Sequence, residues 1–269
     1  MDYYEGLDEP PERPPDVVEG QAVDALRAMF TARPKDVFTS KQLQVLLEDR
    51  FFHWITGRAL KVLEEAGEIT IDPRTLSFGG PINLIWHRRH RYPLRQAKEI
   101  MALVEKYSDA TFTSALGQNG ELLVSDGFGR FGFMQRGRNV REFGDKRWIE
   151  TDHDLDFLFE KDGRTYGVEV KNTLSYIHDG ELRLKLRLCA HIGVLPVFVV
   201  RAMPGIWFRE VSDQGGFTLM LKHQLYPYGH RALAVEVQAK MGLPVDAPRA
   251  LQDGTIQRLV NWHERQIGR

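Results

Sequence analysis

The chain has 269 residues, of which 42% are hydrophobic and 27% charged, and its formal net charge is −1. A chain of this length can bury a substantial core, in one large domain or in two smaller ones. No apolar run approaches the roughly 20 residues that a membrane-spanning helix needs, and the single cysteine excludes a disulfide framework or a cysteine-rich zinc site. We therefore expect a cytoplasmic globular protein with no membrane partner.

The first 19 residues differ in composition from the rest of the chain. They are rich in proline and carry seven acidic residues against one base, Arg13. Such a composition predicts an acidic disordered tail over residues 1–19. The remaining residues hold 35 bases and 30 acids, so the body of the protein is mildly basic. A basic body permits a polyanionic partner without requiring one.

Residues 20–92 have the pattern of three short helices followed by a β-hairpin. Apolar spacing predicts a helix soon after residue 20, and Thr39 with Gln42 has the sequence of a capping box at the start of a second. A third helix is expected at about 52–66. Residues 68–89 then read as two strands around a turn-rich connection. The stretch resembles the winged helix-turn-helix family.

In that family the third helix enters the major groove of duplex DNA, and the hairpin touches backbone phosphate. The resemblance implies DNA contacts from the third helix and from the end of the hairpin, namely Trp54, Thr56, Arg58, Lys61, Arg88 and Arg89. The alternative is a docking or dimerisation module in which Trp54 belongs to the core.

Residues 153–172, HDLDFLFEKDGRTYGVEVKN, predict a second hairpin. Asp162-Gly163 is the sequence of a two-residue type I′ turn. That turn pairs Phe159 with Tyr166, Phe157 with Val168 and Leu155 with Val170. Side chains alternate between faces with period two, so one face is expected to carry the apolar set Leu155, Phe157, Phe159, Tyr166, Val168 and Val170.

The other face of this hairpin carries charged residues. In the same register Asp156 lies opposite Glu169, with Cβ atoms about 5 Å apart, and Asp154 lies opposite Lys171. Opposed carboxylates destabilise a sheet, whereas a divalent cation held by their oxygens converts the repulsion into binding. Two alternatives remain open: a plain salt bridge between Asp154 and Lys171, and a solvated face on which Asp156 and Glu169 hold no ligand.

The spacing Asp156-X12-Glu169-X-Lys171 on adjacent strands resembles the PD-(D/E)xK nuclease superfamily. Its core order of helix, three strands, helix and strand maps onto residues 119–128, 131–138, 153–160, 166–172, 182–192 and 195–201. The chain departs from the family pattern in having no proline before the aspartate. It also lacks an evident glutamine motif after the lysine, for which Lys185 is the nearest substitute.

The two resemblances together imply an α/β protein. A winged-helix domain at 20–92 is followed at 93–269 by a restriction endonuclease-like domain, with a central mixed β-sheet flanked by helices. The implied function is that of a metal-dependent DNA endonuclease, a Mg²⁺-dependent hydrolase for which Mn²⁺ can substitute. Cutting both strands of duplex or branched DNA usually needs two sites, so a homodimer is expected.

The nuclease resemblance also assigns roles to individual residues. Asp156, Glu169 and Lys171 are the implied catalytic set. The metal ligands are Asp156, Glu169, the Val170 carbonyl and the first-helix acid Glu121, while Asp154 is expected to steer Lys171. Two bases of the basic segment 134–148, Arg136 and Arg138, are expected to contact phosphate.

Two other functions remain possible. One is a DNA-binding regulator whose nuclease-like domain is inactive and serves dimerisation. The other is cleavage of RNA in place of DNA.

Overall fold

The computed structural model describes residues 16–267. The chain divides into two compact units, residues 1–102 and 103–269, and the division falls inside helix α4 (Pro93–Ser108). Residues 1–15 of the expected acidic tail lie outside the described residues. Residues 17–19 of that tail are helical: α1 begins at Val17, because the Asp16 carboxylate accepts hydrogen bonds from the backbone N–H groups of Val18 and Glu19.

Before α4, the described part of the first unit contains three helices and a three-stranded antiparallel sheet. In chain order they are α1 (Val17–Ala32), β1 (Val37–Thr39), α2 (Ser40–Leu46), α3 (His53–Glu65), β2 (Ile69–Thr75) and β3 (Pro81–His87). The strand order is β1-β3-β2. The predicted capping box is confirmed, since Thr39 and Gln42 exchange hydrogen bonds at the start of α2. The short strand β1 is an element that the sequence pattern does not predict.

The second unit is built on a five-stranded mixed sheet. Its strands are β4 (Met134–Val140), β7 (Leu155–Lys161), β8 (Arg164–Lys171), β9 (Leu195–Val200) and β10 (Phe217–Met220), in the order β10-β9-β8-β7-β4. Strand β9 runs parallel to both β8 and β10, whereas β4, β7 and β8 are antiparallel neighbours. Two small ribbons pair β5 (Glu142–Phe143) with β6 (Lys146–Arg147) and β11 (Gln224–Leu225) with β12 (Val245–Asp246).

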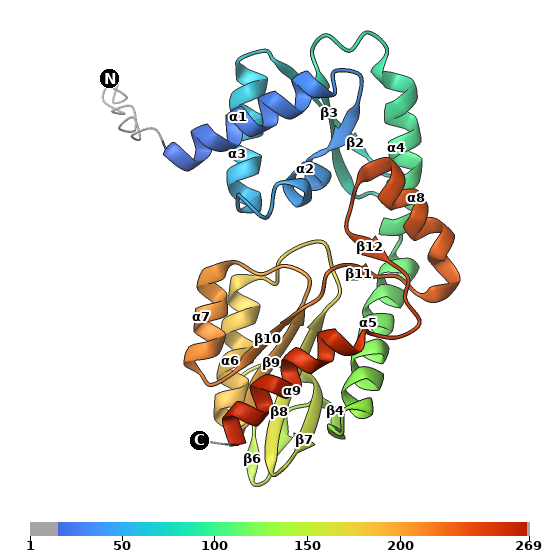
Figure 1. The fold of residues 1–269 in the computed structure, drawn as a ribbon. Helices are drawn as coiled ribbons and strands as arrows, with labels where there is room; N and C mark the ends of the chain where they lie inside the picture. The colour runs from blue at the N-terminus through green and yellow to red at the C-terminus, as the bar shows by residue number, and fades with distance from the viewer. Residues whose placement is uncertain (1–15, 268–269) are drawn as a thin grey trace, which may run out of the picture. The chain divides into compact units, whose positions relative to one another are not determined.

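Helices cover both faces of this sheet, so the protein is α/β (Figure 1). Helices α5 (Ala110–Arg130) and α9 (Asp253–Ile267) share one hydrophobic core with Phe157, Tyr166 and Val168. Helices α6 (Asp179–Ile192) and α7 (Gly205–Asp213) pack on the other face, against Phe198 and Val200. The 3₁₀ turn η1 (Tyr228–His230) leads into α8 (Arg231–Met241). None of the described helices is long and apolar enough to cross a membrane.

The turn and register of the β7–β8 hairpin are as predicted over most of its length. Asp162 and Gly163 have φ values of +48° and +73°, as a type I′ turn requires. The ladder pairs Phe159 with Tyr166 and Phe157 with Val168.

The hairpin departs from the prediction at its open end. The ladder ends at Phe157, and the next residue, Asp156, uses its side chain to accept a hydrogen bond from the Val170 N–H at 2.6 Å. Leu155 then packs with Leu188 on α6, away from the core that contains Phe157. The expected pairing of Leu155 with Val170, and the shared face of Leu155 and Phe157, are therefore wrong. A carboxylate takes the place of a backbone partner here, and the alternation of side chains breaks.

Asn172 connects the end of β8 to α5 and β11 by hydrogen bonds. Its Nδ2 donates to the carbonyl oxygens of Leu116 on α5 and Leu225 on β11, and its Oδ1 accepts from the Leu225 N–H, at 2.7–2.8 Å. Gly120 of α5 lies directly against it, because a Cβ on Gly120 would meet the Asn172 Cβ at 2.7 Å. The small size of residue 120 therefore lets α5 approach the strand that carries the candidate site.

Gly120→Ala tests this close approach. Alanine is expected to destabilise the protein by about 1–3 kcal/mol, because the added methyl group overpacks a buried contact. The matched control is Gly117→Ala in the same helix, where no atom lies within 4 Å of the new Cβ. That change is expected to stabilise by up to about 1 kcal/mol through helix propensity. Urea denaturation measures both, and equal effects of the two substitutions would contradict the packing argument.

Candidate active site

A cluster of charged side chains gathers where β7 begins, β8 ends and α6 passes over them. Strand β8 directs Val168 and Val170 into the core beneath α5 and α9, so the alternating residues Glu169 and Lys171 face α6. Asp156, Glu169 and Lys171 therefore lie at the same end of the hairpin, although the predicted cross-strand pair of Asp156 and Glu169 lies beyond the ladder, which ends at Phe157. Helix α6 adds Glu181 and Lys185 to the cluster.

Glu169 is the centre of the cluster and is 1% exposed. Its Oε1 lies 2.7 Å from the Lys171 Nζ, and its Oε2 lies 2.7 Å from the Lys185 Nζ. Within residues 16–267 neither oxygen accepts a hydrogen bond of good geometry. Lys185 also donates to the backbone carbonyl of Asp154. Two ammonium groups thus compensate a buried carboxylate that would otherwise be very costly to bury.

Lys171 is held between two carboxylates. Its Nζ lies 2.7 Å from an oxygen of Glu169 and 2.7 Å from an oxygen of Glu181. Burial disfavours its charged form, but the two glutamates outweigh burial and keep the pKa of Lys171 above its ordinary value. The side chain is therefore a cation at neutral pH. Because it remains 26% exposed, it can also reach a group that arrives from solvent.

The surroundings of Asp156 disfavour the ionised form of its carboxyl group. Burial first, and then the negative charge of Glu169, raise its pKa to about 7, against the opposing hydrogen bond from the Val170 N–H and the charges of Lys171 and Lys185. Near neutral pH the group therefore exchanges between its two forms. Two carboxyl groups that repel each other in a partly buried site indicate a position suited to a proton or a metal cation.

Of the two α6 residues, Glu181 was not predicted from the sequence, and Lys185 was predicted only as the nearest substitute for the family's glutamine motif. The β7–β8 ladder ends at Phe157, before the expected pair of Asp154 and Lys171. Asp154 accepts a hydrogen bond from Lys185 through its backbone carbonyl, and Lys171 pairs with Glu181. One signal for Lys185 is present in the sequence. It stands in the apolar stripe of Leu182, Leu186 and Cys189 on α6, where a charge needs a buried partner.

Glu121 does not join the cluster. It lies on α5, where its carboxylate pairs with Arg138 at 2.7 Å, and the Arg138 guanidinium lies 5.0 Å from the centre of the Phe157 ring. Phe157 belongs to the core under α5 and α9, on the sheet face opposite to Glu169. Among residues 16–267 no three His, Cys, Asp or Glu side chains are grouped to hold a metal ion. The expectation that Glu121 is a third acidic ligand is therefore not met.

The expected DNA contacts of α3 divide into exposed and buried residues. Trp54 is 52% exposed and stacks on Phe52, so it is available at the surface, as is Lys61. Thr56 is wrong as a DNA contact: it is 0% exposed, because it lies on the core side of the helix. Arg58 is exposed but forms ion pairs with Asp16, the N-cap residue of α1, and with Glu19 in that helix.

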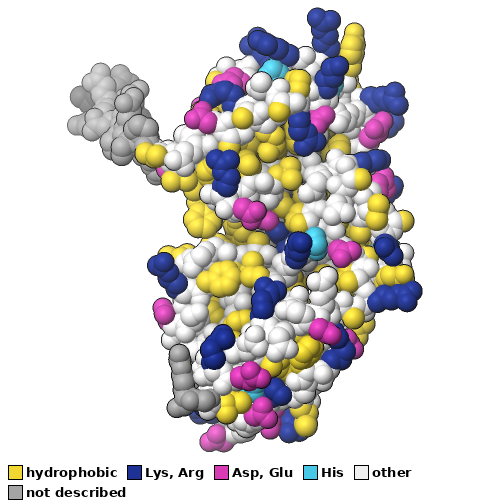
Figure 2. Space-filling model, viewed as in Figure 1, with side chains coloured by type: hydrophobic (Ala, Val, Ile, Leu, Met, Phe, Trp, Pro, Cys, Tyr) yellow, Lys and Arg dark blue, Asp and Glu magenta, His cyan; other side chains and the backbone are white. Residues whose placement is uncertain are grey.

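The other expected phosphate contacts are exposed bases, some with acidic partners. Arg88 and Arg89 are exposed, and Arg88 donates to the Gly67 carbonyl at 3.4 Å. Arg136 pairs with Glu160, and Arg138 with Glu121 as described. Basic and acidic side chains are interspersed over the visible faces in Figure 2. Exposed pairs of this kind contribute about 1 kcal/mol or less, so a guanidinium can exchange its carboxylate for a phosphate.

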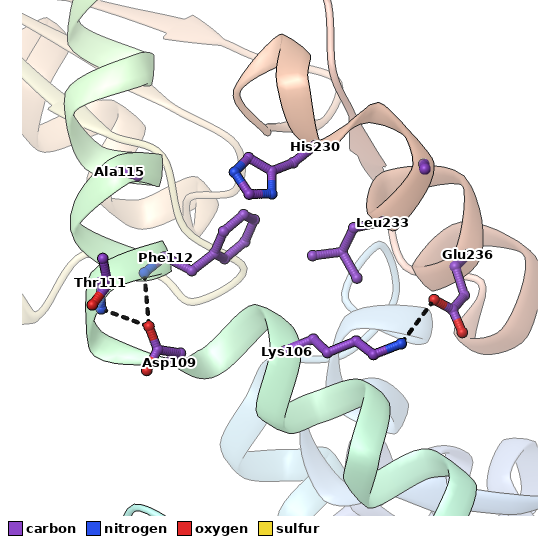
Figure 3. Close-up of a pocket in the computed structure, with 9 residues that line it drawn as sticks. Lys106, Asp109, Thr111, Phe112, Ala115, His230, Leu233 and Glu236 are labelled. Carbon is purple, nitrogen blue, oxygen red and sulfur yellow. Dashed lines mark hydrogen bonds and ion pairs between the residues drawn. The ribbon is translucent and has the colours of Figure 1, made fainter.

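A separate pocket of about 550 Å³ opens between the start of α5 and the segment from η1 to α8 (Figure 3). Phe112, Leu233 and His230 line it, and none of its lining residues belongs to the charged cluster. The charged groups at its rim are already engaged: Lys106 pairs with Glu236 at 3.4 Å, and Asp109 caps α5. The pocket therefore does not present the converging polar groups expected of a catalytic site.

The raised pKa of Asp156 predicts a pH-dependent effect of Asp156→Asn on stability. The folded state binds this proton more tightly than the unfolded chain, so the parent loses stability as pH rises from about 4 to about 7. Asparagine removes this loss. The free energy of unfolding of the variant is expected to exceed that of the parent by on the order of 1–3 kcal/mol at pH 8, and by less at pH 5.

Urea denaturation in EDTA at the two pH values measures this difference. Asp145→Asn, in the exposed turn between β5 and β6, serves as the control and should remain close to the parent. If the free energies of unfolding of Asp156→Asn and the parent differ by the same amount at both pH values, the raised pKa of Asp156 is contradicted.

Comparison with models of known protein families finds no match, and comparison with curated proteins finds none either. Among solved structures, a complex of EndoMS with double-stranded DNA is similar over 57% of this chain, at 12% identity and a TM-score of 0.27. The match covers 64% of that chain, so this protein spans less than two thirds of it. A likeness at this TM-score carries no argument about function.

Proposed function

We propose that the protein is a metal-dependent DNA endonuclease of the PD-(D/E)xK type. The observation that supports the proposal best is a cluster of three charged side chains at the end of the hairpin: Lys171 lies 2.7 Å from Glu169, and the Asp156 carboxyl group is close enough to Glu169 for their charges to interact. The two carboxyl groups repel each other, which a fold selected for stability alone would avoid. A catalytic role would explain why the two carboxyl groups are kept close to each other despite their repulsion.

The residues present fit a divalent cation such as Mg²⁺, with Mn²⁺ as a substitute. Mg²⁺ in enzymes is commonly held by one or two carboxylates together with waters and substrate phosphate, and Asp156 and Glu169 supply two carboxylates. The backbone carbonyl of Val170 is the third ligand we propose. When bound, the cation would polarise the scissile phosphate and promote deprotonation of an attacking water.

Lys171 carries the remaining chemistry in this proposal. Its ammonium group would donate a hydrogen bond that orients the attacking water, and it would offset the negative charge that develops on the phosphate oxygens. Glu181 limits the motion of Lys171 from the other side. Asp156 would be held in place by the Val170 N–H, which fixes its carboxylate at the open end of the hairpin.

The first unit would bring duplex or branched DNA to this chemistry as a winged helix. Exposed Trp54 and Lys61 on α3 support this role, as do Arg88 and Arg89 beyond the end of β3. Phosphate contacts of this kind set position more than specificity. A homodimer would place one site on each strand of the duplex.

One observation favours the alternative of an inactive nuclease-like domain in a DNA-binding regulator. Glu169 is almost fully buried and both of its oxygens face lysines, so it is compensated without a metal ion. The raised pKa of Asp156 argues against this alternative, because a site without a ligand has no reason to retain the repulsion.

Cleavage of DNA tests the proposed activity. The purified protein with Mg²⁺ is expected to cut plasmid or branched DNA, and EDTA should abolish the cutting. Lys171→Ala and Glu169→Gln should each lower the rate by about 10²-fold or more, because the first removes the positive charge that offsets the developing negative charge and the second removes a ligand of the proposed metal ion.

Arg164→Ala is the control for the cleavage assay. Arg164 is an exposed base at the opposite end of the same strand, and its loss should leave the rate close to that of the parent. Intact substrates with Mg²⁺ and with Mn²⁺, or unchanged cutting by both site variants, would reject the proposal. Strong metal-independent binding of DNA without any cleavage would favour the alternative of an inactive nuclease-like domain. Cleavage of RNA but not of DNA would mean that RNA is the substrate.

Lys61→Ala tests the DNA contact of α3. Loss of one phosphate contact is expected to weaken binding to duplexes of any sequence, and to reduce the slope of log affinity against log salt by about 1. Lys35→Ala, which removes an exposed lysine between α1 and β1, serves as the matched control. If both variants bind equally, α3 is not the DNA-binding helix.

A further inference from the structure

Lys185 occupies a position lined by oxygen atoms. The residue is 4% exposed, and its Nζ contacts the Glu169 Oε2 at 2.7 Å and the backbone carbonyl of Asp154. It is also close enough to Asp156 for their charges to interact. Carboxylate and carbonyl oxygens around a positive charge are the surroundings that a hard metal cation prefers. Here the positive charge belongs to the protein.

The two lysines of the cluster differ in their freedom to move. Lys171 keeps about a quarter of its side chain exposed and also pairs with Glu181 at the rim. Lys185 lies on the buried stripe of α6 beside Leu182 and Leu186, and its ammonium group is held by the Glu169 Oε2 and the Asp154 carbonyl. The Glu169 Oε2 is therefore engaged by a buried partner. Only the side of Glu169 that faces Lys171 can accept an incoming cation.

The balance of charge leads to the same result. Asp156, Glu169 and Glu181 carry three negative charges when ionised, against two positive charges on Lys171 and Lys185. One divalent cation and one phosphodiester group bring the cluster to neutrality. A second divalent cation would leave two uncompensated positive charges around a carboxylate that is almost fully buried, which is strongly unfavourable.

We propose that this site binds a single divalent cation, and that Lys185 takes the place of a second one. The inference rests on the proposed function and specifies its metal stoichiometry. It assigns Lys185 a positioning role: the residue supplies fixed positive charge to Glu169 and holds the start of β7 through Asp154.

Counting bound Mn²⁺ tests the inference without any measurement of activity. The full chain is titrated with Mn²⁺ in the absence of DNA, and free Mn²⁺ is measured by electron paramagnetic resonance. We expect one ion per chain for the parent, and its loss in Glu169→Gln. In Lys185→Ala the Glu169 Oε2 and the Asp154 carbonyl become available, so two ions are expected. Arg187→Ala removes an exposed base from the same helix and should leave one.

The possible outcomes separate the inference from the function on which it rests. Two ions on the parent, or one ion of unchanged affinity on Lys185→Ala, overturns the inference while the proposed nuclease stands. A parent that binds no Mn²⁺ at any practical concentration rejects the metal-dependent function itself. If circular dichroism shows that Lys185→Ala is unfolded, Lys185→Met replaces it, since methionine is uncharged, fills most of the buried volume and leaves both oxygen atoms available. One ion on that folded variant overturns the inference.

Discussion

The burial of Glu169 is the constraint on which the rest of the site depends. A carboxylate that is almost removed from water is stable only if positive charges lie against it, and here Lys171 and Lys185 each approach to 2.7 Å. Lys185 comes from α6, so the helix must cross the sheet where its side chain meets the end of β8. Lys171 in turn brings Glu181 to the rim. One buried charge therefore determines the position of a helix, a strand end and a second acid.

The ends of the two strands are held by polar side chains in place of ladder hydrogen bonds. The Asp156 carboxylate accepts from the Val170 N–H where the β7–β8 ladder stops, and Asn172 binds backbone groups of α5 and β11 just beyond Lys171. Both devices lie beside the catalytic candidates. They hold the open end of a hairpin, which would otherwise fray, at the position where the proposed chemistry requires fixed geometry.

Local patterns in the sequence predicted those parts of the fold that depend on neighbouring residues. The Asp162-Gly163 turn and the pairing of Phe157 with Val168 follow from turn chemistry and side-chain alternation. The capping box at Thr39 has the same local origin. Errors arose where tertiary packing overrides the local pattern. Leu155 leaves its predicted face for the core under α6, and Thr56 turns into the core of the first unit.

By itself, the sequence predicted which charged residues of β7 and β8 gather at one end of the hairpin, because the turn defines the register of the ladder up to Phe157. It could not determine the partners of those residues. Glu121 and Glu181 are both acids on helices that pack against the sheet, and no local pattern tells which helix covers which face. Only the tertiary structure places Glu121 on the far face with Arg138, and Glu181 and Lys185 above Glu169. The physical reason is that a charge from a distant segment becomes a partner through helix packing, which the spacing of residues within one strand does not encode.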